Sequence, residues 1–348
     1  MIRQTLTSLS SIAGIGADTI IDVRAPLEFA EDHIPGAINL PVLSDDERAQ
    51  VGTIYTRQSA FLARKVGAAL VAANASRHLQ GPLADKQGDW QPLVYCWRGG
   101  QRSGSFATIL DQVGWRVHLI EGGYRSYRKQ VTARLYDTPL PHRIRLIDGG
   151  TGTAKTALLH HLRDAGAQIL DLEGLAAHRG SLFGSLDIAQ PSQKMFESRL
   201  AAELEALDPA QITWVEGESS KIGGRMIPPA LWAAMIAAPR IEVSAPIAAR
   251  AAFLATAYAD LTQDREKLNQ QIGQLSSYHA AATITGWHAL AEGADWETLA
   301  GELMSQHYDP RYTKSQARAD QTPEQFTLEA LDPETLADAA RSLIEQFS

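Results

Sequence analysis

The stretch LVYCWRGGQRS, residues 93–103, decides the fold of the first part of this 348-residue chain. Its apolar start predicts a short buried strand, and Cys96, the single cysteine of the sequence, opens a loop directly after it. The loop holds two glycines and two arginines: Gly99, Gly100, Arg98 and Arg102. Glycines let the backbone turn tightly, so that its N–H groups and the guanidinium charge favour a thiolate and bind an oxyanion. The pattern predicts a reactive cysteine facing an anionic substrate, although a lone cysteine is more often a small buried residue.

Regular elements alternate on both sides of this stretch. We expect strands at residues 20–24, 37–40 and 117–120, helices at 57–73 and 103–113, and an exposed loop at 80–91. Strands that alternate with helices indicate a parallel sheet with helices on both faces. Ligands of such sheets bind at the carboxyl ends of the strands, where Cys96 is expected to lie.

The composition is typical of a globular protein of two domains, with 45% hydrophobic and 21% charged residues. No apolar run approaches the roughly 20 residues that a membrane helix needs. The N-terminal residues lack the apolar region of a signal peptide. One cysteine excludes intrachain disulfides and Cys-rich metal sites. These features predict a cytoplasmic protein that has no membrane partner.

The net charge of −8 is unevenly spread, because residues 143–348 carry an excess of acidic side chains and the first 142 residues a slight basic excess. Basic residues gather between residues 121 and 145: Arg125, Arg128, Lys129, Arg134, Arg143 and Arg145. A local basic patch binds a polyanion even when the whole molecule is acidic. Charge alone favours the other interpretation, a solvated helix face.

A domain boundary is predicted at residues 137–142, DTPLPH, because two prolines cannot continue the preceding helix. The chain is thereby divided into a domain of residues 1–136, a linker and a second α/β domain of residues 143–348. In the second domain we expect strands at 144–148, 168–172, 212–216 and 240–243, and helices at 156–164, 192–207 and 332–346. The alanine-rich residues 245–300 predict helices without a chemical signature.

The second domain opens with GGTGTAKT, residues 149–156, between a strand and a helix. This is the phosphate-binding P-loop pattern with one departure, at Ala154. We expect backbone N–H groups to hold a diphosphate, Lys155 to bridge its oxygens and Thr156 to reach a possible Mg²⁺ ion. The predicted diphosphate ligands are Gly149, Gly152, Thr153, Lys155 and Thr156.

Two further features qualify this P-loop. Ala154 adds a methyl group where the loop joins the helix, and we expect it to adopt right-handed backbone geometry. Glu216 ends an apolar strand and is a candidate acidic partner, although acidic residues at strand ends are common. A glycine-rich turn with an exposed lysine is the alternative to a phosphate site.

The spacing Cys-x5-Arg-Ser, from Cys96 to Ser103, is shared by the rhodanese superfamily of sulfur-transfer enzymes and by cysteine-dependent phosphatases. Three flanking segments strengthen the resemblance to a rhodanese domain: DVR at 22–24, HIPGAIN at 33–39 and LIEGG at 119–123. The resemblance covers about residues 5–130. Loop size would separate the sulfur-transfer and phosphatase alternatives, and the sequence alone does not settle it.

The remaining distinctive sequence segments are residues 171–184, 190–194, 215–223 and 307–312. Together with the P-loop and the rhodanese-like domain, these segments resemble the bacterial tRNA 2-selenouridine synthase family over essentially the whole chain. The resemblance implies an N-terminal rhodanese-like parallel-sheet domain, followed by a P-loop NTPase-like α/β domain with a helical C-terminal part. It implies a transferase that replaces the sulfur of 2-thiouridine, at the wobble position of tRNAs of the Lys, Glu and Gln type, with selenium.

The substrates implied by the resemblance are selenophosphate and geranyl diphosphate, with an S-geranyl-2-thiouridine intermediate. No tightly bound cofactor is expected, and a supplier of selenophosphate is an expected partner. We predict that Cys96 acts in the selenium step, while Arg98, Arg102, Gly99 and Gly100 bind selenophosphate. The P-loop would bind the geranyl donor, although a nucleotide is an alternative ligand. The candidate tRNA contacts are Arg125, Arg128, Lys129, Arg179, Lys221 and Arg225.

Two other functional classes stay open at this point. One is a rhodanese-type sulfurtransferase fused to a kinase-like domain, which would act without tRNA. The other is a non-catalytic module built from an inactive rhodanese domain and a nucleotide sensor, against which the intact Cys96 argues.

Overall fold

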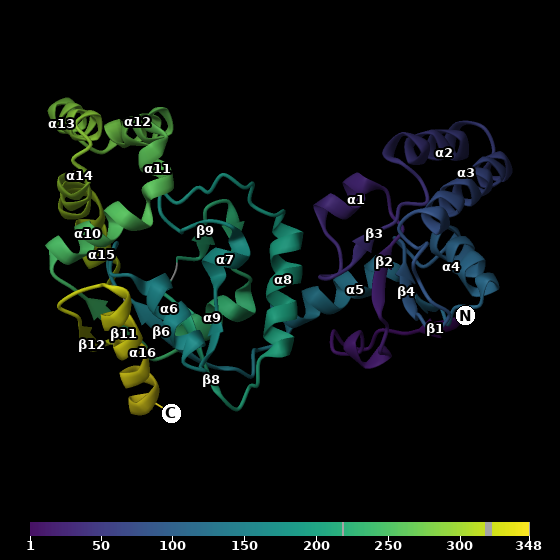
Figure 1. The fold of residues 1–348 in the computed structure, drawn as a ribbon, viewed down its shortest axis with the longest axis horizontal. Helices are drawn as coiled ribbons and strands as arrows, with labels where there is room; N and C mark the ends of the chain where they lie inside the picture. The colour runs from purple at the N-terminus through teal and green to yellow at the C-terminus, as the bar shows by residue number, and fades with distance from the viewer. Residues whose placement is uncertain (218, 317–321, 348) are drawn as a thin grey trace. The chain divides into compact units, whose positions relative to one another are not determined.

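The computed structural model describes residues 1–217, 219–316 and 322–347, which form two compact units. One unit consists of Met1–Pro139 with Pro191–Ala206, and the other of Leu140–Gln190 with Leu207–Ser348. Each unit is built on its own parallel five-stranded sheet, which confirms the predicted α/β class (Figure 1).

The sheet of the first unit has the strand order β1-β5-β4-β2-β3, and all of its pairings are parallel. The strands are β1 (Ile2–Gln4), β2 (Thr19–Asp22), β3 (Ile38–Asn39), β4 (Pro92–Tyr95) and β5 (His118–Ile120). The helices are α1 (Pro26–Glu31), α2 (Asp45–Arg57), α3 (Ala60–Gln80), α4 (Gln101–Val113) and α5 (Gly123–Thr132), with a π-helical turn at Ala133–Asp137. The central strand β4 is buried along its whole length and leads directly into Cys96.

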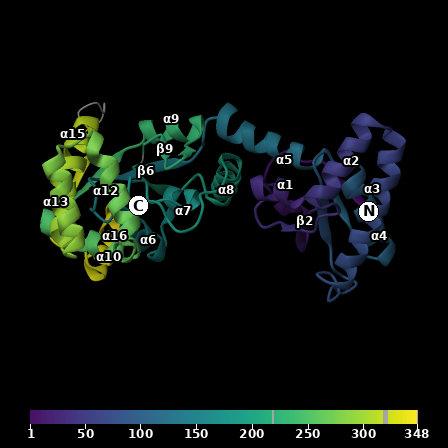
Figure 2. The same cartoon turned by 90° about the horizontal axis from the view of Figure 1, so that it is seen from above.

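The helix expected at residues 57–73 is α3, which begins three residues later and continues to Gln80. The preceding helix α2, which was not expected, lies beside it (Figures 1 and 2). The break falls at Gln58 and Ser59. The Ser59 hydroxyl accepts hydrogen bonds from the backbone N–H groups of Phe61 and Leu62, and so caps the start of α3. The cap separates α3 from α2 and sets the start of the predicted helix at Ala60.

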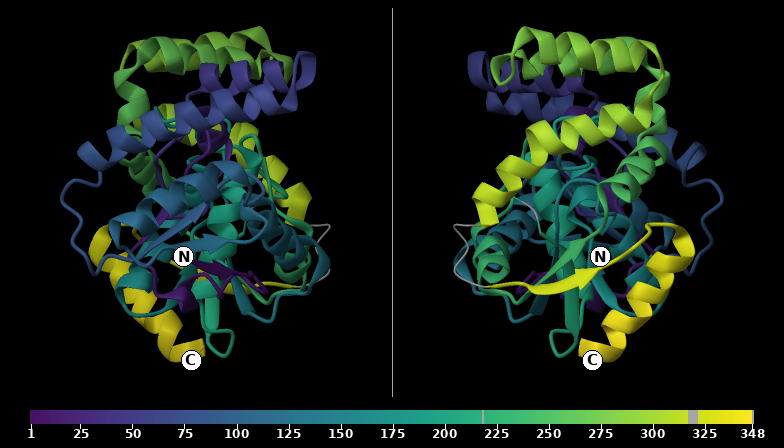
Figure 3. Two further views of the ribbon diagram at one scale, coloured as in Figure 1. Left: turned by 90° about the vertical axis from the view of Figure 1, so that its right-hand side faces the viewer. Right: turned by 90° about the vertical axis from the view of Figure 1, so that its left-hand side faces the viewer.

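The sheet of the second unit has the order β12-β11-β6-β8-β7, again all parallel. Its strands are β6 (Arg143–Asp148), β7 (Gln168–Leu170), β8 (Ile212–Glu216), β11 (Arg240–Ser244) and β12 (Glu324–Thr327). The edge strand β12 was not expected from the sequence. Figure 3 shows this strand leading into α16 (Pro333–Phe347), in yellow. The helix α16 packs against α6 (Lys155–Asp164).

The predicted helical stretch 245–300 is a subdomain with a core of its own around the fully buried Trp287. Its helices are α10 (Ile247–Ala257), α11 (Ala259–Gln263), α12 (Arg265–Gln274), α13 (Ala281–Glu292) and α14 (Trp296–Leu303). A π-helical turn at Met304–Tyr308 and α15 (Asp309–Gln316) follow them. The short elements α7 (Leu172–Ala176), α9 (Pro229–Ala237) and the antiparallel hairpin β9–β10 (Lys221–Ile222, Arg225–Met226) complete this unit.

The helix α8 (Gln193–Ala206) forms where the sequence predicted a helix, but it packs in the first unit, against α5 and the following π-helical turn. The buried carboxylate of Glu197 forms an ion pair with Arg128 and accepts a 2.7 Å hydrogen bond from the Tyr136 hydroxyl. Arg134 pairs with Glu205 at 3.2 Å. The first unit therefore combines the residues before the expected linker at 137–142 with a returning segment. None of the helices in the described ranges has the length and apolarity needed to cross a membrane.

Candidate active sites

Cys96 lies at the carboxyl end of β4, immediately before a loop that leads into α4. The residue is 3% exposed, and the Ser103 hydroxyl, from the first turn of α4, donates a hydrogen bond to its sulfur at 3.0 Å. The backbone N–H of Tyr124 donates to the Cys96 carbonyl at 2.8 Å. Cys96 is therefore fixed from both sides, by α4 and by the start of α5.

Two glycines let the cysteine loop approach the turn after β5. Gly99 has a φ of +65°, and a Cβ atom there would lie 2.8 Å from the Ile120 carbonyl oxygen. Gly123 has a φ of +59°, and its Cβ would lie 2.1 Å from the Cys96 carbonyl oxygen. Side chains are excluded at both positions. This contact explains why the sequence carries a glycine pair after β5 together with the glycines of the cysteine loop.

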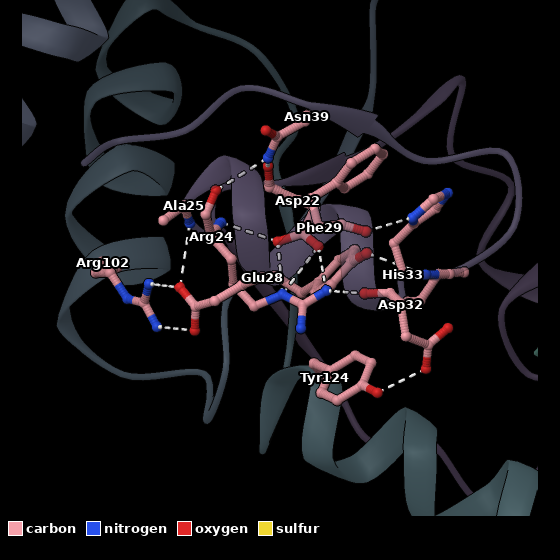
Figure 4. Close-up of polar contacts among 12 residues, drawn as sticks. Asp22, Arg24, Ala25, Glu28, Phe29, Asp32, His33, Asn39, Arg102 and Tyr124 are labelled. Atoms are coloured by element: carbon pink, nitrogen blue, oxygen red, sulfur yellow. Dashed lines mark hydrogen bonds and ion pairs between the residues drawn. The ribbon is translucent and has the colours of Figure 1, made fainter. Parts of the chain in front are cut away.

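A buried ion-pair network lies beside this loop (Figure 4). The Arg24 guanidinium, 1% exposed, donates to both carboxylate oxygens of Asp22 and to the Asp32 carbonyl oxygen. It lies 4.1 Å from the centre of the Tyr124 ring, whose hydroxyl donates to Asp32 at 2.6 Å. Burial and the neighbouring Asp32 carboxylate raise the pKa of Tyr124, which therefore stays protonated as a donor. The DVR signature thus supports the loop structurally.

The two arginines of the cysteine loop lie in different surroundings. Arg102 donates to the Glu28 carboxylate at 2.7 Å (Figure 4). Arg48 also pairs with Glu28, at 3.0 Å. Burial opposes ionisation of Glu28, but the Arg102 hydrogen bond and the charges of both arginines outweigh it and lower the pKa of that carboxyl. Arg98 is exposed beside Cys96. Of Arg48, Arg98 and Arg102, Arg98 is the one that forms no ion pair with a carboxylate of the described residues.

The P-loop connects β6 to α6 as the sequence predicts. Lys155 Nζ lies across the loop and donates to the carbonyl oxygens of Gly149, at 2.7 Å, and Gly150, at 3.3 Å. The Thr156 hydroxyl donates to Glu173 at 3.1 Å. Together with Gly149, Gly152 and Thr153, both side chains line one cleft, and Glu173 and the fully buried Glu216 are also in its wall.

The expected right-handed geometry of Ala154 is wrong. Its φ is +60° and its ψ +28°, a left-handed conformation that the P-loop pattern normally assigns to glycine. The alanine therefore keeps the loop conformation of a glycine at some cost in backbone strain. Because the Ala154 side chain is buried in the core beside α6, packing compensates for part of this strain.

The sequence interpretation missed residues that hold the P-loop in place. Arg250, within the stretch predicted to lack a chemical signature, donates to the Thr151 carbonyl at 2.6 and 2.9 Å and pairs with Asp309 at 2.7 Å. Tyr312 donates to Asp148 at 3.3 Å. Asp309 and Tyr312 lie in the segment 307–312, which the family resemblance singles out, whereas no sequence pattern around Arg250 points to the P-loop.

A metal ion would need a cluster of ligands. In the described ranges, no group of three or more His, Cys, Asp or Glu residues is arranged to hold one. Thr156 and Glu173 nevertheless offer a hydroxyl and a carboxylate beside the P-loop, the oxygen ligands that Mg²⁺ prefers. The Mg²⁺ site at Thr156 remains a prediction.

The candidate tRNA contacts fall into three settings. Arg125 and Lys129 are exposed on α5, whereas Arg128 on the same helix is engaged with Glu197 and the Lys194 carbonyl. Arg179 pairs with Asp260 at 3.0 Å and lines the P-loop cleft. Lys221 lies on β9 and Arg225 on β10, the two strands of the antiparallel hairpin, and Lys221 is exposed.

A thiol loop on one parallel sheet and a P-loop on another define a rhodanese domain fused to a P-loop domain. Residues 5–130 match the family model of the rhodanese-like domain, and residues 142–283 match that of the tRNA 2-selenouridine synthase AAA domain. The tRNA 2-selenouridine synthase of Psychromonas ingrahamii is 34% identical over 262 residues, which cover 75% of this chain and 70% of that protein.

Two further relatives carry the same name. The Nitrosomonas europaea protein is 34% identical over 76% of this chain and 75% of its own length. The Salmonella arizonae protein is 43% identical over 67% of this chain and 65% of its own length. The chain belongs to the tRNA 2-selenouridine synthase family, as its motifs predicted.

Proposed function

We propose that this protein converts 2-thiouridine at the tRNA wobble position to 2-selenouridine in two steps, each served by one of its anion sites. The observation that supports this most directly is the presence, in one chain of this family, of both a cysteine loop and an intact P-loop lysine. Two anionic donors, a selenophosphate and a diphosphate ester, require two such sites.

In the first step the tRNA sulfur attacks the first carbon of geranyl diphosphate. A carbon–sulfur bond forms, the carbon–oxygen bond to diphosphate breaks, and diphosphate carries away the charge. Lys155 and the N–H groups of residues 149–154 stabilise that charge, so the P-loop assists departure of a leaving group without hydrolysing a nucleotide.

In the second step the selenium of selenophosphate attacks the modified carbon of the base, the bond from that carbon to sulfur breaks, and the geranylated sulfur takes a proton from solvent and leaves as a thiol. Water then attacks the phosphorus atom, the phosphorus–selenium bond breaks, and phosphate leaves while the selenium stays on the base. Cys96 serves this step. Arg98 and the N–H groups of Gly99 and Gly100 bind selenophosphate. Arg102 adds positive charge to this site while it pairs with Glu28. The exposed Arg125 and Lys129 on α5, with Lys221, contact the tRNA backbone. Another enzyme must supply selenophosphate.

The division of labour predicts opposite losses in two variants. Cys96→Ser should retain geranylation of 2-thiouridine tRNA and lose selenation. Lys155→Ala should lower the geranylation rate about 10²–10³-fold, as expected when a group that stabilises developing charge is removed. The measurement is mass spectrometry of nucleosides from tRNA incubated with selenophosphate and geranyl diphosphate.

The control is Lys65→Ala, which removes an exposed lysine of α3 and should change neither step. Full selenation by Cys96→Ser would contradict the role of the cysteine loop. Unchanged geranylation by Lys155→Ala would exclude the P-loop as the site of the geranyl donor. Sulfur transfer to a small thiol without any tRNA would instead favour a plain sulfurtransferase.

A further inference from the structure

An apolar pocket adjoins the P-loop cleft in the second unit. Five residues line both spaces: Thr151, Ser181, Leu254, Tyr258 and Tyr308. The pocket and its open mouth together contain about 580 Å³ of space between the lining atoms. The two spaces therefore form a continuous site with one charged end and one apolar end.

The lining of this pocket is almost entirely hydrocarbon. It comes from the helical subdomain, chiefly from Leu254 and Ala255 on α10, Leu268 on α12, and Leu299, Ala300 and Leu303 on α14. The polar groups at its mouth already interact with each other, since the Tyr258 and Ser181 hydroxyls lie 3.3 Å apart. A nucleoside base would find few hydrogen-bond partners there and would lose those that it has in water. A hydrocarbon chain forms no hydrogen bonds with water and would lose none on binding.

The pocket wall also touches the P-loop directly. A Cβ atom on Gly152 would lie 2.9 Å from Leu254 Cδ1 and 3.2 Å from the Met304 sulfur, and both of those residues line the pocket. Arg250, one helical turn before Leu254 on α10, binds the Thr151 carbonyl of the loop. One helix, α10, thus contributes both to the hold on the phosphate loop and to the apolar wall.

We propose that this pocket binds the hydrocarbon chain of the diphosphate donor, while the P-loop binds its diphosphate. The inference rests on the proposed function, because it assumes that the P-loop takes a diphosphate ester. It goes further in naming the helical subdomain, α10 to α14, as the part of the protein that selects an apolar ester over a nucleotide.

The test compares binding of geranyl diphosphate and inorganic diphosphate to the full chain by isothermal titration calorimetry. The wild-type protein should bind geranyl diphosphate about tenfold or more tightly than inorganic diphosphate, because the chain buries several methylene groups. Ala255→Phe fills the pocket from α10 and should remove most of this preference, while the affinity for inorganic diphosphate stays within about twofold. Ala300→Phe fills it from α14 and provides an independent second variant.

The matched control is Ala252→Phe, the same substitution at an exposed position of α10, which should leave both affinities unchanged. A geranyl preference that survives both pocket variants overturns the inference, and so does a wild-type protein without any preference. In either case, binding of inorganic diphosphate that depends on Lys155 leaves the proposed function standing. A wild-type protein that binds neither compound overturns both.

Discussion

At the scale of single residues, Arg24 shows how a buried charge is stabilised by its hydrogen-bond partners. Its guanidinium forms two-point contacts with the fully buried Asp22 and a further bond to a backbone carbonyl (Figure 4). The aromatic ring of Tyr124 covers it at 4.1 Å, and the same residue holds the Cys96 carbonyl through its backbone. The ion pair therefore positions the cysteine loop without contacting the sulfur.

We predict that Arg24→Met lowers the free energy of unfolding of the first unit by about 3–5 kcal/mol, because Asp22 is left as an unpaired buried charge. The measurement is the urea concentration at which Cys96 reacts with a thiol reagent. Since Cys96 is the single cysteine and is buried, its reaction reports on this unit alone.

Arg48→Met is the control for this change. The Arg48 side chain is 52% exposed, so loss of its pair with Glu28 should cost less than about 1 kcal/mol. Equal urea midpoints for the two variants would show that the buried pair does not stabilise the loop.

The sequence predicted this region unevenly. The DVR segment and the two glycine pairs could be recognised in the sequence because each is a local pattern. The partners of Arg24 were not, since Asp32 and Tyr124 lie 8 and 100 residues further along the chain and only the fold brings them together. The pairing of Arg102 with Glu28 was hidden for the same reason, because nothing local shows that the two residues lie together. That Arg102 binds the anion stays a prediction.

At the scale of elements, α8 shows that a correctly predicted helix need not belong to the expected domain. Its periodicity shows a helix at residues 192–207 but carries no information about which sheet the helix covers. The deciding contacts are Glu197 with Arg128 and Tyr136, residues that precede the predicted linker. The strand β12 was missed on similar grounds, because a four-residue edge strand has too short a pattern to be distinguished from a loop.

We predict that Glu197→Gln destabilises the first unit by about 2–3 kcal/mol, because it removes the charged partner of Arg128 inside the protein. Cys96 should therefore react with a thiol reagent at a lower urea concentration than in the wild-type protein. Glu205→Gln, in the same helix, removes a carboxylate that is 27% exposed and should cost less than about 1 kcal/mol. An unchanged Cys96 midpoint in Glu197→Gln would mean that α8 does not unfold with this unit.

At the scale of the whole molecule, each sheet carries its ligand loop at the carboxyl end of a central strand, as parallel sheets do in general. The class of fold and both loops could therefore be predicted. The support of the P-loop could not, because it comes from about 100 and 160 residues further along the chain, in Arg250, Asp309 and Tyr312. The helical subdomain thus serves the loop both by anchoring it and by forming the apolar wall beside it.

A buried histidine in the π-helical turn after α14 makes the stability of the second unit depend on pH. His307 is 6% exposed, and its Nδ1 accepts a hydrogen bond from Arg311 at 2.7 Å, with the His279 ring nitrogen 2.9 Å away. Burial, and then the charges of Arg311 and His279, lower the pKa of His307 to about 4. The ring is therefore neutral in the folded protein at neutral pH.

Because the folded pKa lies below the unfolded value of about 6.5, the unfolded chain takes up the extra proton first as the pH falls. The contribution of His307 to stability is fully present above pH 6.5 and is lost between about pH 6.5 and pH 4, by at most about 1.4 kcal/mol per pH unit. Urea unfolding followed by tryptophan fluorescence should show a less stable second unit at pH 5 than at pH 7, with Cys96 reactivity tracking the first unit separately. His307→Gln should reduce this difference, and His161→Gln, a less buried histidine of the same unit, should leave it unchanged. If His307→Gln keeps the full pH difference, the proton is taken up elsewhere, and the neutral His307 ring does not govern how the second unit responds to acid.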